Sequence, residues 1–412
     1  MDDWTEYRLG DIVEINPTES IKKGTIAKKI GMDILQPYCR AIPSFSLEPY
    51  SGGSKFKNGD TIMARITPCL ENGKTAMVNI LDKNEIGFGS TEYIVFRAKE
   101  NITDPFFIYY LVTSDKIRNP AIKSMVGSSG RQRVQTDVVA NLSINLPSLE
   151  TQKKIGALLS SLDDKIELNN RINDNLEQQA QAIFKSWFVD FEPFGGNLPE
   201  NWRLGTLADI ADYYNGYAFS SKELLNEPTD DCLDVFKQGH IKKGGGFNSE
   251  GTKSWYPLSK CKNLQNYILK KGDILMAMTD MKGNVAILGN TSIMPVDDKY
   301  IVNQRVGLLR AKKDLNIDYP YLYLLTNEHH FLMDLRSRAN SGVQVNLSSS
   351  AIKESEINIA PKEIYSKFNN IVLPLFEQTL ANQLENQKLA SLRDNLLPKL
   401  MSGELDVDSV QI

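Results

Sequence analysis

The chain has 412 residues, which is too long for one ordinary domain and is consistent with two to four structural units. Apolar residues make up 41% and charged residues 24% of the chain, the composition of a soluble globular protein. A formal net charge of -4 excludes a chain coated with basic charge, but it leaves room for a local basic surface that binds nucleic acid.

Neither export nor a membrane location is expected. The sequence has no run approaching the roughly 18 apolar residues of a transmembrane helix. The acidic start, Met1-Asp2-Asp3-Trp4, lacks the apolar core of a secretory signal. Cys39, Cys69, Cys232 and Cys261 lie far apart without a C-x-x-C pair, so neither a zinc site nor a disulfide framework is predicted. We therefore expect a cytoplasmic protein with reduced thiols.

Residues 1–147 are predicted to form an α+β domain. A Gly59-Asp60 turn leads into an apolar strand, and a second β-rich run covers residues 90–97. An Asp-Pro start predicts a capped helix over 104–111, and its aromatic residues are expected in the core rather than on a base-stacking platform. A short apolar strand then ends at Pro147, where the character changes to a long helix.

A long helix is predicted over residues 148–192, because apolar positions alternate at spacings of four and three, as in a coiled-coil seam. At about 1.5 Å per residue, the part from Leu149 to Asp190 is about 60 Å long. Buried asparagines in such a seam fix its register at a cost in stability. The stripe consists of Ile155, Leu159, Leu162, Ile166, Asn169, Asn173, Leu176, Ala180, Ile183 and Trp187.

The second half of the chain repeats the first, at a period of roughly 200 to 213 residues. Trp202 opens it as Trp4 opens the first half, and Gly272-Asp273 repeats the turn. Residues 318–325 repeat the capped helix, and a second Ser-Gly loop with a glutamine precedes Pro361. We therefore expect a second α+β domain.

The second domain is assigned to 193–361, followed by another long helix and a tail over 362–412. Pro374 predicts a kink or an interruption in this helix, and Arg393 departs from an ideal seam. The stripe, displaced by 213 residues, consists of Phe368, Val372, Leu375, Thr379, Asn382, Asn386, Leu389, Arg393, Leu396 and Leu400. The predicted fold is α+β, with two tandem domains, two long antiparallel coiled-coil helices and a pseudo-two-fold internal repeat. A solvent-facing position for the asparagines stays open, because neighbouring apolar residues blur the stripe.

The order of these motifs, present twice, resembles the specificity subunit of type I restriction–modification systems, the family called HsdS. The resemblance covers essentially the whole chain. It is carried by the turns at 57–60 and 271–275, the Ser-Gly-x-Gln loops, the helix start at 146–155 with 162–166, and the runs 183–191 and 396–405. The second helix start, at 361–365, lacks the fuller motif of the first.

The resemblance implies a non-catalytic subunit with target-recognition domains at 1–147 and 193–361. Each domain would read one half of a bipartite, interrupted site in double-stranded DNA. The helices at 148–192 and 362–412 would set the spacing and dock two methyltransferase subunits. Those partners would bind S-adenosylmethionine and methylate adenine, so no cofactor is expected in this chain, and restriction–translocase subunits could join them.

Motifs of an independent enzyme are missing. Gly73-Lys74-Thr75 is similar to the end of a phosphate-binding loop, but Pro68 stands where the first glycine is required. The sequence has no N-P-P-F or D-P-P-Y tetrapeptide of an amino-methyltransferase. His240 stands alone, and the adjacent His329 and His330 point to different helix faces, so no metal site is predicted.

Reading bases directly requires Arg, Lys, Asn, Gln, Ser or Thr side chains at base edges. The two Ser-Gly loops are the strongest candidates, because they combine charged and amide side chains with flexible glycines. Solvated surface charge is the alternative for all of these residues. It is the weaker interpretation for the two loops and at least as strong for the residues outside them. The first-half candidates are Ser128, Ser129, Arg131, Gln132, Arg133, Arg65, Thr67, Lys74 and Thr91. The second-half candidates are Arg338, Asn340, Ser341, Gln344, Asn303, Gln304, Arg305, Thr279 and Lys282.

Partner docking is expected on the helices, with Trp187 and Phe188 as an exposed aromatic anchor. The alternative, that Trp187 simply belongs to the seam, stays open. The candidate spacer and docking residues are Ile155, Leu162, Asn169, Asn173, Leu176, Trp187, Phe188, Leu375, Asn382, Asn386, Leu389 and Leu396. The alternative function is a coiled-coil scaffold whose two similar domains bind protein or another ligand. Salt-dependent, sequence-selective DNA binding distinguishes the two functions.

Overall fold

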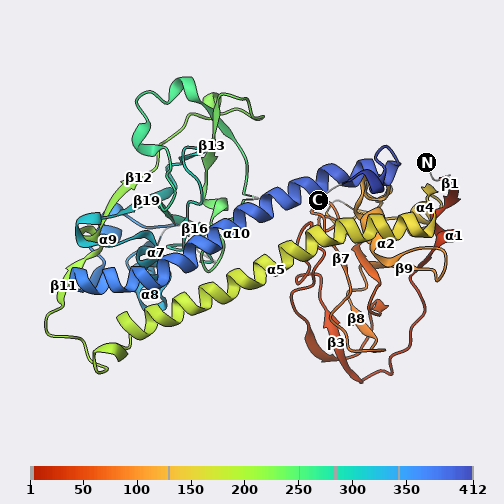
Figure 1. Ribbon diagram of the computed structural model, residues 1–412, viewed down its shortest axis with the longest axis horizontal. Coiled ribbons are helices and arrows are strands. Elements are labelled where there is room, and N and C mark those ends of the chain that lie inside the picture. Colours follow the sequence, from red (N-terminus) through yellow and green to blue (C-terminus); the bar gives the residue numbers. More distant parts are fainter. Residues whose placement is uncertain (1–3, 129, 250, 282–284, 342–343, 411–412) are drawn as a thin grey trace. The chain divides into compact units, whose positions relative to one another are not determined.

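The computed structural model of the chain describes residues 4–410 except 129, 250, 282–284 and 342–343 (Figure 1). The chain divides into two compact units. Unit 1 comprises residues 1–170 and 385–412, and unit 2 comprises residues 171–384. Each unit contains part of both long helices, α5 (Leu149–Phe188) and α10 (Lys362–Ser402). This grouping differs from the four consecutive segments expected from the sequence, because helical residues pack on the globular region beside them.

The centre of unit 1 is an antiparallel four-stranded sheet in the order β2-β9-β6-β7. A second sheet has the order β4-β3-β8-β5, and β1 pairs with β10. The strands are β1 (Thr5–Arg8), β2 (Val13–Ile15), β3 (Ile26–Ile30), β4 (Ser46–Pro49), β5 (Lys55–Phe56), β6 (Thr61–Ala64), β7 (Thr75–Met77), β8 (Gly87–Gly89), β9 (Tyr93–Ala98) and β10 (Ser143–Leu146). The short helices are α1 (Leu9–Ile12), α2 (Pro105–Thr113), α3 (Asp115–Lys123) and α4 (Thr136–Ala140), and a 3-10 turn, η7 (Val407–Ser409), lies near the C-terminus.

Unit 2 has a central antiparallel sheet in the order β12-β19-β15-β17, with sheets β14-β13-β18 and β16-β21-β20 and the pair β11-β22 beside it. The strands are β11 (Arg203–Thr206), β12 (Ala211–Asn215), β13 (Cys232–Phe236), β14 (Trp255–Pro257), β15 (Ile274–Ala277), β16 (Thr279–Met281), β17 (Thr291–Ile293), β18 (Tyr300–Val302), β19 (Val306–Ala311), β20 (Asn340–Ser341), β21 (Gln344–Asn346) and β22 (Glu356–Ile359). The helices are α6 (Leu207–Ile210), α7 (Tyr319–Asn327), α8 (His329–Ser337) and α9 (Ser349–Lys353). The 3-10 turns are η1 (Glu192–Phe194), η2 (Ser221–Glu223), η3 (Gln238–His240), η4 (Leu258–Lys260), η5 (Gln265–Tyr267) and η6 (Lys313–Leu315).

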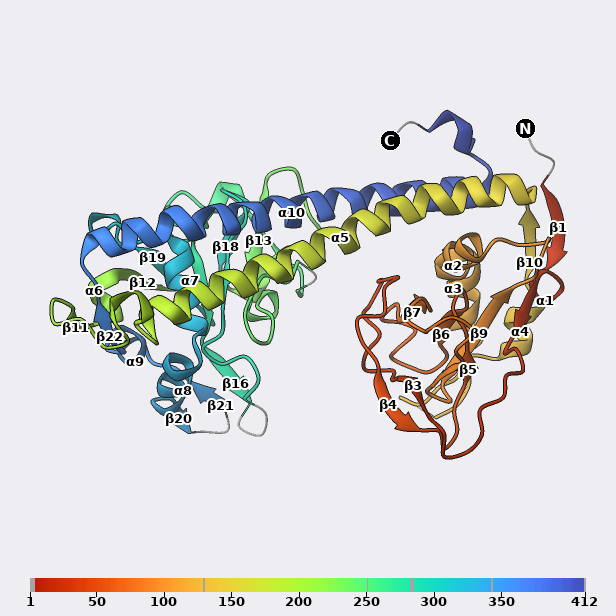
Figure 2. The same ribbon diagram turned by 60° about the horizontal axis from the view of Figure 1, so that its bottom comes forward.

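A similar order of elements recurs in the two units (Figure 2), although unit 2 contains in addition the strands β16, β20 and β21. In each central sheet the strand after the Gly-Asp turn lies between its hairpin partner and a long strand, β9 or β19. A parallel pair follows the same plan, β3 with β8 and β13 with β18. In the part of the chain that the structure describes, no helix is both long and apolar enough to cross a membrane.

The Gly-Asp turn of unit 1 is closed by a buried ion pair. Gly59 has a φ of 89°, which favours glycine, and the fully buried Asp60 follows it. The Asp60 carboxylate accepts bonds from the Lys57 backbone N–H at 2.8 Å and from two nitrogens of the Arg97 guanidinium at 2.7 Å each. Since Asp60 directly precedes β6 and Arg97 lies in β9, this contact sets the pairing of the two strands.

Unit 2 contains a corresponding Gly-Asp turn with an Asp–Arg ion pair. Gly272 has a φ of 86°, and the buried Asp273 accepts a bond from the Lys270 backbone N–H at 2.9 Å. Two nitrogens of the Arg310 guanidinium, in β19, donate to Asp273 at 2.8 Å each. The recurrence of the Gly-Asp motif in the sequence therefore has a physical cause, which is the fixed start of a central strand.

Replacing Asp60 by alanine is expected to destabilise unit 1 by about 1.5–3 kcal/mol, because Arg97 loses both of its bonds to this carboxylate and keeps Glu19 as its remaining acidic partner among the described residues. Asp273→Ala is expected to have the same effect in unit 2. Hydrogen exchange of the amides in β6, β9, β15 and β19 of the full-length chain measures each effect separately. Asp82→Ala is the control, since that side chain is 85% exposed in its ion pair with Lys28, and removing it should cost about 1 kcal/mol or less. Unchanged protection in Asp60→Ala would contradict the assigned role.

The two capped helices form as predicted. Asp104 accepts a bond from the Phe107 backbone N–H at 3.0 Å at the start of α2. Asp318 precedes α7 and accepts a bond from the backbone N–H of the next residue, Tyr319, at 2.7 Å. Apart from the exposed Phe106, their aromatic residues, such as Tyr110, are buried in the hydrophobic cores, which confirms the expectation of a core role for these residues.

In unit 1 the helical segments of α5 and α10 run in opposite directions and are joined by polar contacts. Arg393 donates to the buried Asp163 at 2.6 Å, and Asp163 also accepts a bond from the Tyr110 hydroxyl at 2.6 Å. Asn169 donates to Asn386 at 2.9 Å. Arg393 therefore departs from an apolar stripe because it neutralises a buried carboxylate that also anchors helix α2.

A second arginine attaches the globular region of unit 1 to α5. Arg40 is only 5% exposed, and its guanidinium donates to Glu167 at 3.0 and 2.7 Å and to Asp164 at 2.5 Å. The loop that carries Arg40 lies 120 or more residues before these partners. Burial opposes the charged form, but these carboxylates raise the pKa of Arg40 and keep it charged.

In unit 2 the segments of α5 and α10 are also antiparallel, but they pack mainly through aromatic rings. Phe188 lies 5.0 Å from Phe368 and 4.9 Å from Tyr321, measured between ring centroids. Asn382 donates to Asn173 at 2.8 Å, and both side chains are buried. The asparagines thus face the other helix rather than solvent.

The predicted interruption of the second helix at Pro374 is wrong, because α10 is continuous from Lys362 to Ser402. Proline removes one backbone hydrogen bond from a helix, at a cost of about 3 kcal/mol. Pro374 is itself exposed, whereas Val372 and Phe376 beside it are buried in the core of unit 2. Burying such side chains contributes about 1.5–3 kcal/mol each, which offsets the lost bond.

Removing one partner of the Asn173–Asn382 pair is expected to destabilise unit 2 more than replacing both partners. Asn382→Ala leaves a buried amide oxygen without a donor, at a cost of about 1–3 kcal/mol to unit 2. Replacing both asparagines by leucine is expected to be neutral or stabilising. Denaturant unfolding with hydrogen exchange of α5 and α10 measures both, with the exposed Gln181→Ala on the same helix as the control. A double variant that is less stable than Asn382→Ala would overturn this prediction.

Candidate nucleic-acid interface

In unit 1 the predicted residues gather where β6 leaves the central sheet. The Thr67 backbone N–H donates to the carbonyl of Gln132 at 3.0 Å, and the Gln132 N–H donates to the Thr67 hydroxyl at 3.1 Å. The Val134 N–H donates to the carbonyl of Arg65 at 2.8 Å. These bonds bring together two segments that are some 65 residues apart and place Arg65, Thr67 and Gln132 side by side.

Glu92 joins this cluster, although the sequence did not single it out. The Arg133 guanidinium donates to the Glu92 carboxylate through Nε at 2.9 Å and Nη2 at 2.7 Å, and Arg65 Nε lies 4.0 Å from the same carboxylate. The hydrogen bonds from Arg133 hold the pKa of the Glu92 carboxyl below its usual value. Thr91 is exposed next to it, just before β9.

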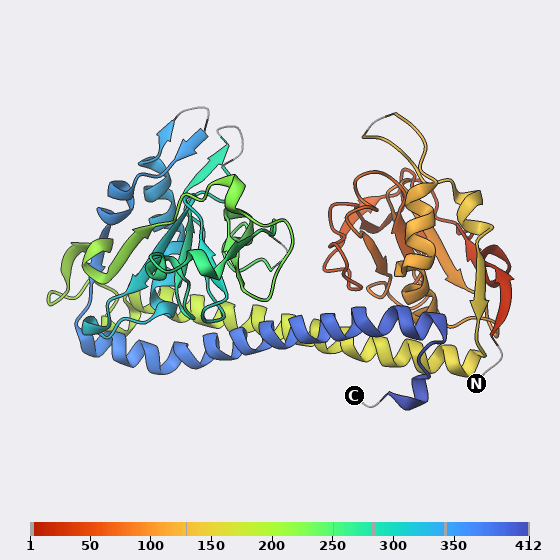
Figure 3. The same cartoon turned by 90° about the horizontal axis from the view of Figure 1, so that it is seen from above.

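The remaining first-half candidates divide into two groups. Ser128 and Arg131 are exposed in a turn closed by an N–H···O bond of 2.9 Å between them, on the side of unit 1 opposite α5 (Figure 3). Ser129 lies outside the described residues. Lys74 does not join the cluster, because its half-buried ammonium donates to the carbonyl of Met32 at 2.7 Å.

In unit 2 the sheet β16-β21-β20 collects four of the predicted residues. Thr279 pairs with Asn346, and Asn340 pairs with the same residue from the other side. Gln344 is exposed in β21 opposite Met281, and Ser341 lies in β20. Lys282 lies outside the described residues.

A further polar residue of this site, Gln238, was missed by the sequence reasoning. Its side-chain amide donates to the carbonyl of Thr279 at 2.5 Å and accepts a bond from the Thr279 hydroxyl at 2.6 Å. Gln238 begins the turn η3 after β13, 41 residues before its partner. Nothing in the local sequence pattern marks it, because the contact depends on how two sheets pack.

The segment Asn303-Gln304-Arg305 lies beside this sheet. The Met278 N–H donates to the carbonyl of Arg305 at 3.1 Å, and the Leu347 N–H donates to the carbonyl of Met278 at 3.0 Å. Gln304 and Arg305 are exposed. Arg338 is less available for a ligand, because it forms an ion pair with Asp334 at 2.8 Å and donates to the carbonyl of Glu354.

The two glutamines of the Ser-Gly loops do not occupy corresponding positions. In unit 1 the backbone of Arg133 forms antiparallel β-bridges with Val126 on one side and Ile66 on the other. Gln132 directly precedes Arg133. In unit 2 the residue that pairs on both sides in this way is Asn346, whose partners are Asn340 and Thr279. Gln344 lies two positions before Asn346. Gln344 therefore corresponds to Arg131, two positions before Arg133, and not to Gln132.

The predicted docking residues lie on the two long helices with mixed exposure. Ile155, Leu162, Asn169, Asn173 and Asn382 are buried, whereas Leu176, Leu375, Asn386, Leu389 and Leu396 are partly buried. The expectation that Trp187 and Phe188 form an exposed anchor is wrong. Both are partly buried against the core of unit 2, and Phe188 contacts rings from α7 and α10 as well as Trp202. These aromatic residues at the end of α5 pack against the hydrophobic core because the globular region of unit 2 covers them.

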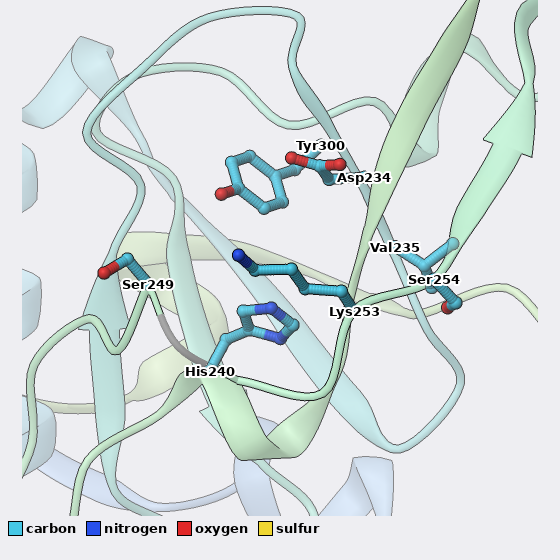
Figure 4. A pocket seen from close by; sticks show the side chains of 7 residues that line it. All are labelled: Asp234, Val235, His240, Ser249, Lys253, Ser254 and Tyr300. Atoms are coloured by element: carbon cyan, nitrogen blue, oxygen red, sulfur yellow. The ribbon is translucent and has the colours of Figure 1, made fainter. Parts of the chain in front are cut away.

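A small hollow in unit 2 contains His240 (Figure 4). The other residues that line it are Asp234, Val235, Ser249, Lys253, Ser254 and Tyr300. His240 is buried, and burial lowers the pKa of its imidazole. Within the described residues, no group of three or more His, Cys, Asp or Glu side chains is placed to hold a metal ion.

The comparisons with known proteins agree on one family. The model of the type I restriction modification DNA specificity domain matches residues 1–178 and 199–393, so this chain belongs to that family. The specificity subunit of type I restriction enzyme HindI from Haemophilus influenzae is 28% identical over 467 residues, covering 98% of this chain and 100% of the relative. The MjaIX specificity subunit from Methanocaldococcus jannaschii is 27% identical over 315 residues, covering 74% of this chain and 70% of the relative.

A solved structure supports the fold. The S subunit of a type I restriction–modification system from M. genitalium matches with a TM-score of 0.58 at 16% identity, covering 97% of this chain and 96% of that one. The resemblance to type I specificity subunits inferred from the sequence is therefore confirmed.

Proposed function

We propose that this chain is the non-catalytic specificity subunit of a type I restriction–modification complex, and that each unit reads one half of a bipartite, interrupted DNA site. The observation that carries the proposal is a polar cluster in each unit, at the end of the central strand. In unit 1 the cluster contains Arg65, Thr67, Gln132 and Arg133, and in unit 2 it contains Gln238, Thr279, Arg305, Asn340 and Gln344.

The chemistry of these clusters suits base reading. Guanidinium and amide groups form paired hydrogen bonds with purine edges, and hydroxyls and further cations bind phosphates. The net charge of -4 means that the whole chain contributes little general attraction to DNA. Binding then depends on the local cations in the clusters and on partner subunits.

The long helices suit the role of a spacer. Each of α5 and α10 contributes residues to both units, and their segments are antiparallel within each unit. A helix of 40 residues is about 60 Å long, nearly two turns of B-DNA at about 34 Å per turn. In this proposal the helices form a coiled coil that relates the two recognition regions by a pseudo-two-fold axis and fixes the gap between the half-sites.

Partner subunits complete the proposed activity. Two methyltransferase subunits dock on the exposed faces of the helices and bring S-adenosylmethionine, and restriction–translocase subunits join this core. The chain itself works in the cytoplasm, where DNA is available. Its own contribution is to choose the sequence and to hold the partners at the two target adenines.

Deleting the gene is expected to remove one interrupted, adenine-methylated motif from the genome of the source cell. A genome-wide map of methylated bases, with and without the gene, measures this and identifies the site. Restoring the gene on a plasmid is the control and should restore the motif. If every modified motif persists after deletion in a cell whose methyltransferase partners are expressed, the chain does not guide methylation, and a scaffold for other ligands becomes the better function.

Each loop glutamine is expected to affect one half of the site. Gln344→Ala should relax preference in the half read by unit 2, and Gln132→Ala in the half read by unit 1. The cost is about 1–3 kcal/mol at one base pair if the amide contacts that base. A binding selection from random duplexes measures the preference, with the exposed Gln265→Ala as the control. An unchanged preference in both variants would show that neither glutamine reads a base.

A further inference from the structure

The backbone hydrogen bonds identify residues of the two units that occupy corresponding positions. In unit 1 the Arg65 N–H donates to the carbonyl of Glu92 at 2.9 Å, and in unit 2 the Met278 N–H donates to the carbonyl of Arg305 at 3.1 Å. Each pair directly extends the ladder between the central strand and the long strand beside it. Glu92 and Arg305 therefore stand at the same place in the fold with opposite charge.

The unit 1 position is an acidic group between two arginines. Glu92 accepts three hydrogen bonds from Arg133, and Arg65 lies 4.0 Å away on its other side. The Glu92 side chain is 22% exposed and that of Arg133 is 46% exposed. A paired arginine–carboxylate contact of this kind fixes the plane of the guanidinium.

The contact leaves part of the Arg133 guanidinium available. Glu92 occupies Nε and Nη2, whereas Nη1 has no partner among the described residues. Arginine has five N–H donors, so the Nη1 group and the second Nη2 hydrogen still form a fork directed away from Glu92. Such a fork matches the O6 and N7 acceptors of guanine in the major groove.

The unit 2 position reaches the same net charge in a different way. Met278 is buried and uncharged where unit 1 has Arg65, and Asn346 stands where unit 1 has Arg133. Arg305 is exposed and has no acidic partner among the described residues. Both three-residue sets therefore carry one positive charge, but only unit 1 uses a carboxylate to direct an arginine.

We propose that Glu92 is a positioning residue for DNA specificity, which holds Arg133 in the direction that reads a guanine in the half-site of unit 1. This inference rests on the proposed DNA-reading function. It assigns Glu92 a role opposite to that of Arg305. Glu92 lowers general attraction to phosphates and increases discrimination between sequences, whereas Arg305 supplies attraction.

Glu92→Gln and its matched counterpart Arg305→Gln test the proposal in the full-length chain assembled with its methyltransferase subunits. Affinities are measured over a salt titration for a duplex with the genomic motif and for a scrambled duplex. Glu92→Gln is expected to reduce the preference for the motif about 5- to 150-fold, the value of one well-formed paired contact. It should raise affinity for the scrambled duplex and steepen the salt dependence by about one unit, since a carboxylate charge is lost. Arg305→Gln should lower that affinity and make the salt dependence shallower by about the same amount.

The variant Arg133→Lys distinguishes the effect of the direction of the guanidinium donors from the effect of the positive charge at this position. Lysine keeps the positive charge but lacks the planar fork, so the preference should fall while the salt dependence stays as in the wild type. Hydrogen exchange of β6 and β9 verifies that Glu92→Gln is folded. A folded Glu92→Gln variant with wild-type preference overturns this inference alone. If the wild-type chain, assembled with its methyltransferase subunits, binds both duplexes equally, the proposed DNA-reading function is overturned, and this inference with it.

Discussion

The buried Asp–Arg pair at the start of each central strand is the contact on which the position of the polar clusters depends. Asp60 fixes the start of β6 to Arg97 in β9. Five residues after Asp60, just past the end of β6, the Arg65 N–H donates to the carbonyl of Glu92, which directly precedes β9. A shift of one residue in this pairing would turn every following side chain to the opposite face of the sheet. The Gly-Asp motif is therefore remote from the proposed interface in the fold, but it determines which side chains reach that interface.

The two units meet the same structural requirement with different chemistry. Each globular region has to be held firmly on its helical segments if it is to present a recognition surface in a defined direction. Unit 1 uses buried charges, with Arg40 bound to Glu167 and Arg393 bound to Asp163. Unit 2 uses an aromatic cluster around Phe188. Buried ion pairs depend strongly on geometry, whereas aromatic packing tolerates small shifts. Both kinds of contact hold a globular region on its helical segments, and the two halves therefore keep one topology although their sequences differ.

Local charge, rather than total charge, connects this fold with DNA recognition. The chain carries a net charge of -4, and in unit 1 even the arginines of the cluster are partly neutralised by Glu92. A surface of this kind attracts DNA weakly in general and discriminates through the direction of its donors. Membership in the family of type I DNA specificity domains agrees with a surface that recognises DNA.

The sequence by itself determined the features that depend on local pattern. The Gly-Asp turns, the capped helices at Asp104 and Asp318 and the asparagines of the long helices could be recognised, because turn, cap and seam chemistry act over a few residues. Only the tertiary structure decided which distant groups meet. Glu92 binds Arg133, and Gln238 forms hydrogen bonds with Thr279, in each case 41 residues away. Trp187 and Phe188 pack against the core of unit 2. Gln344 lies one position away from the place in the fold that corresponds to Gln132. These outcomes follow from strand register and from the packing of sheets and helices, which no local spacing encodes.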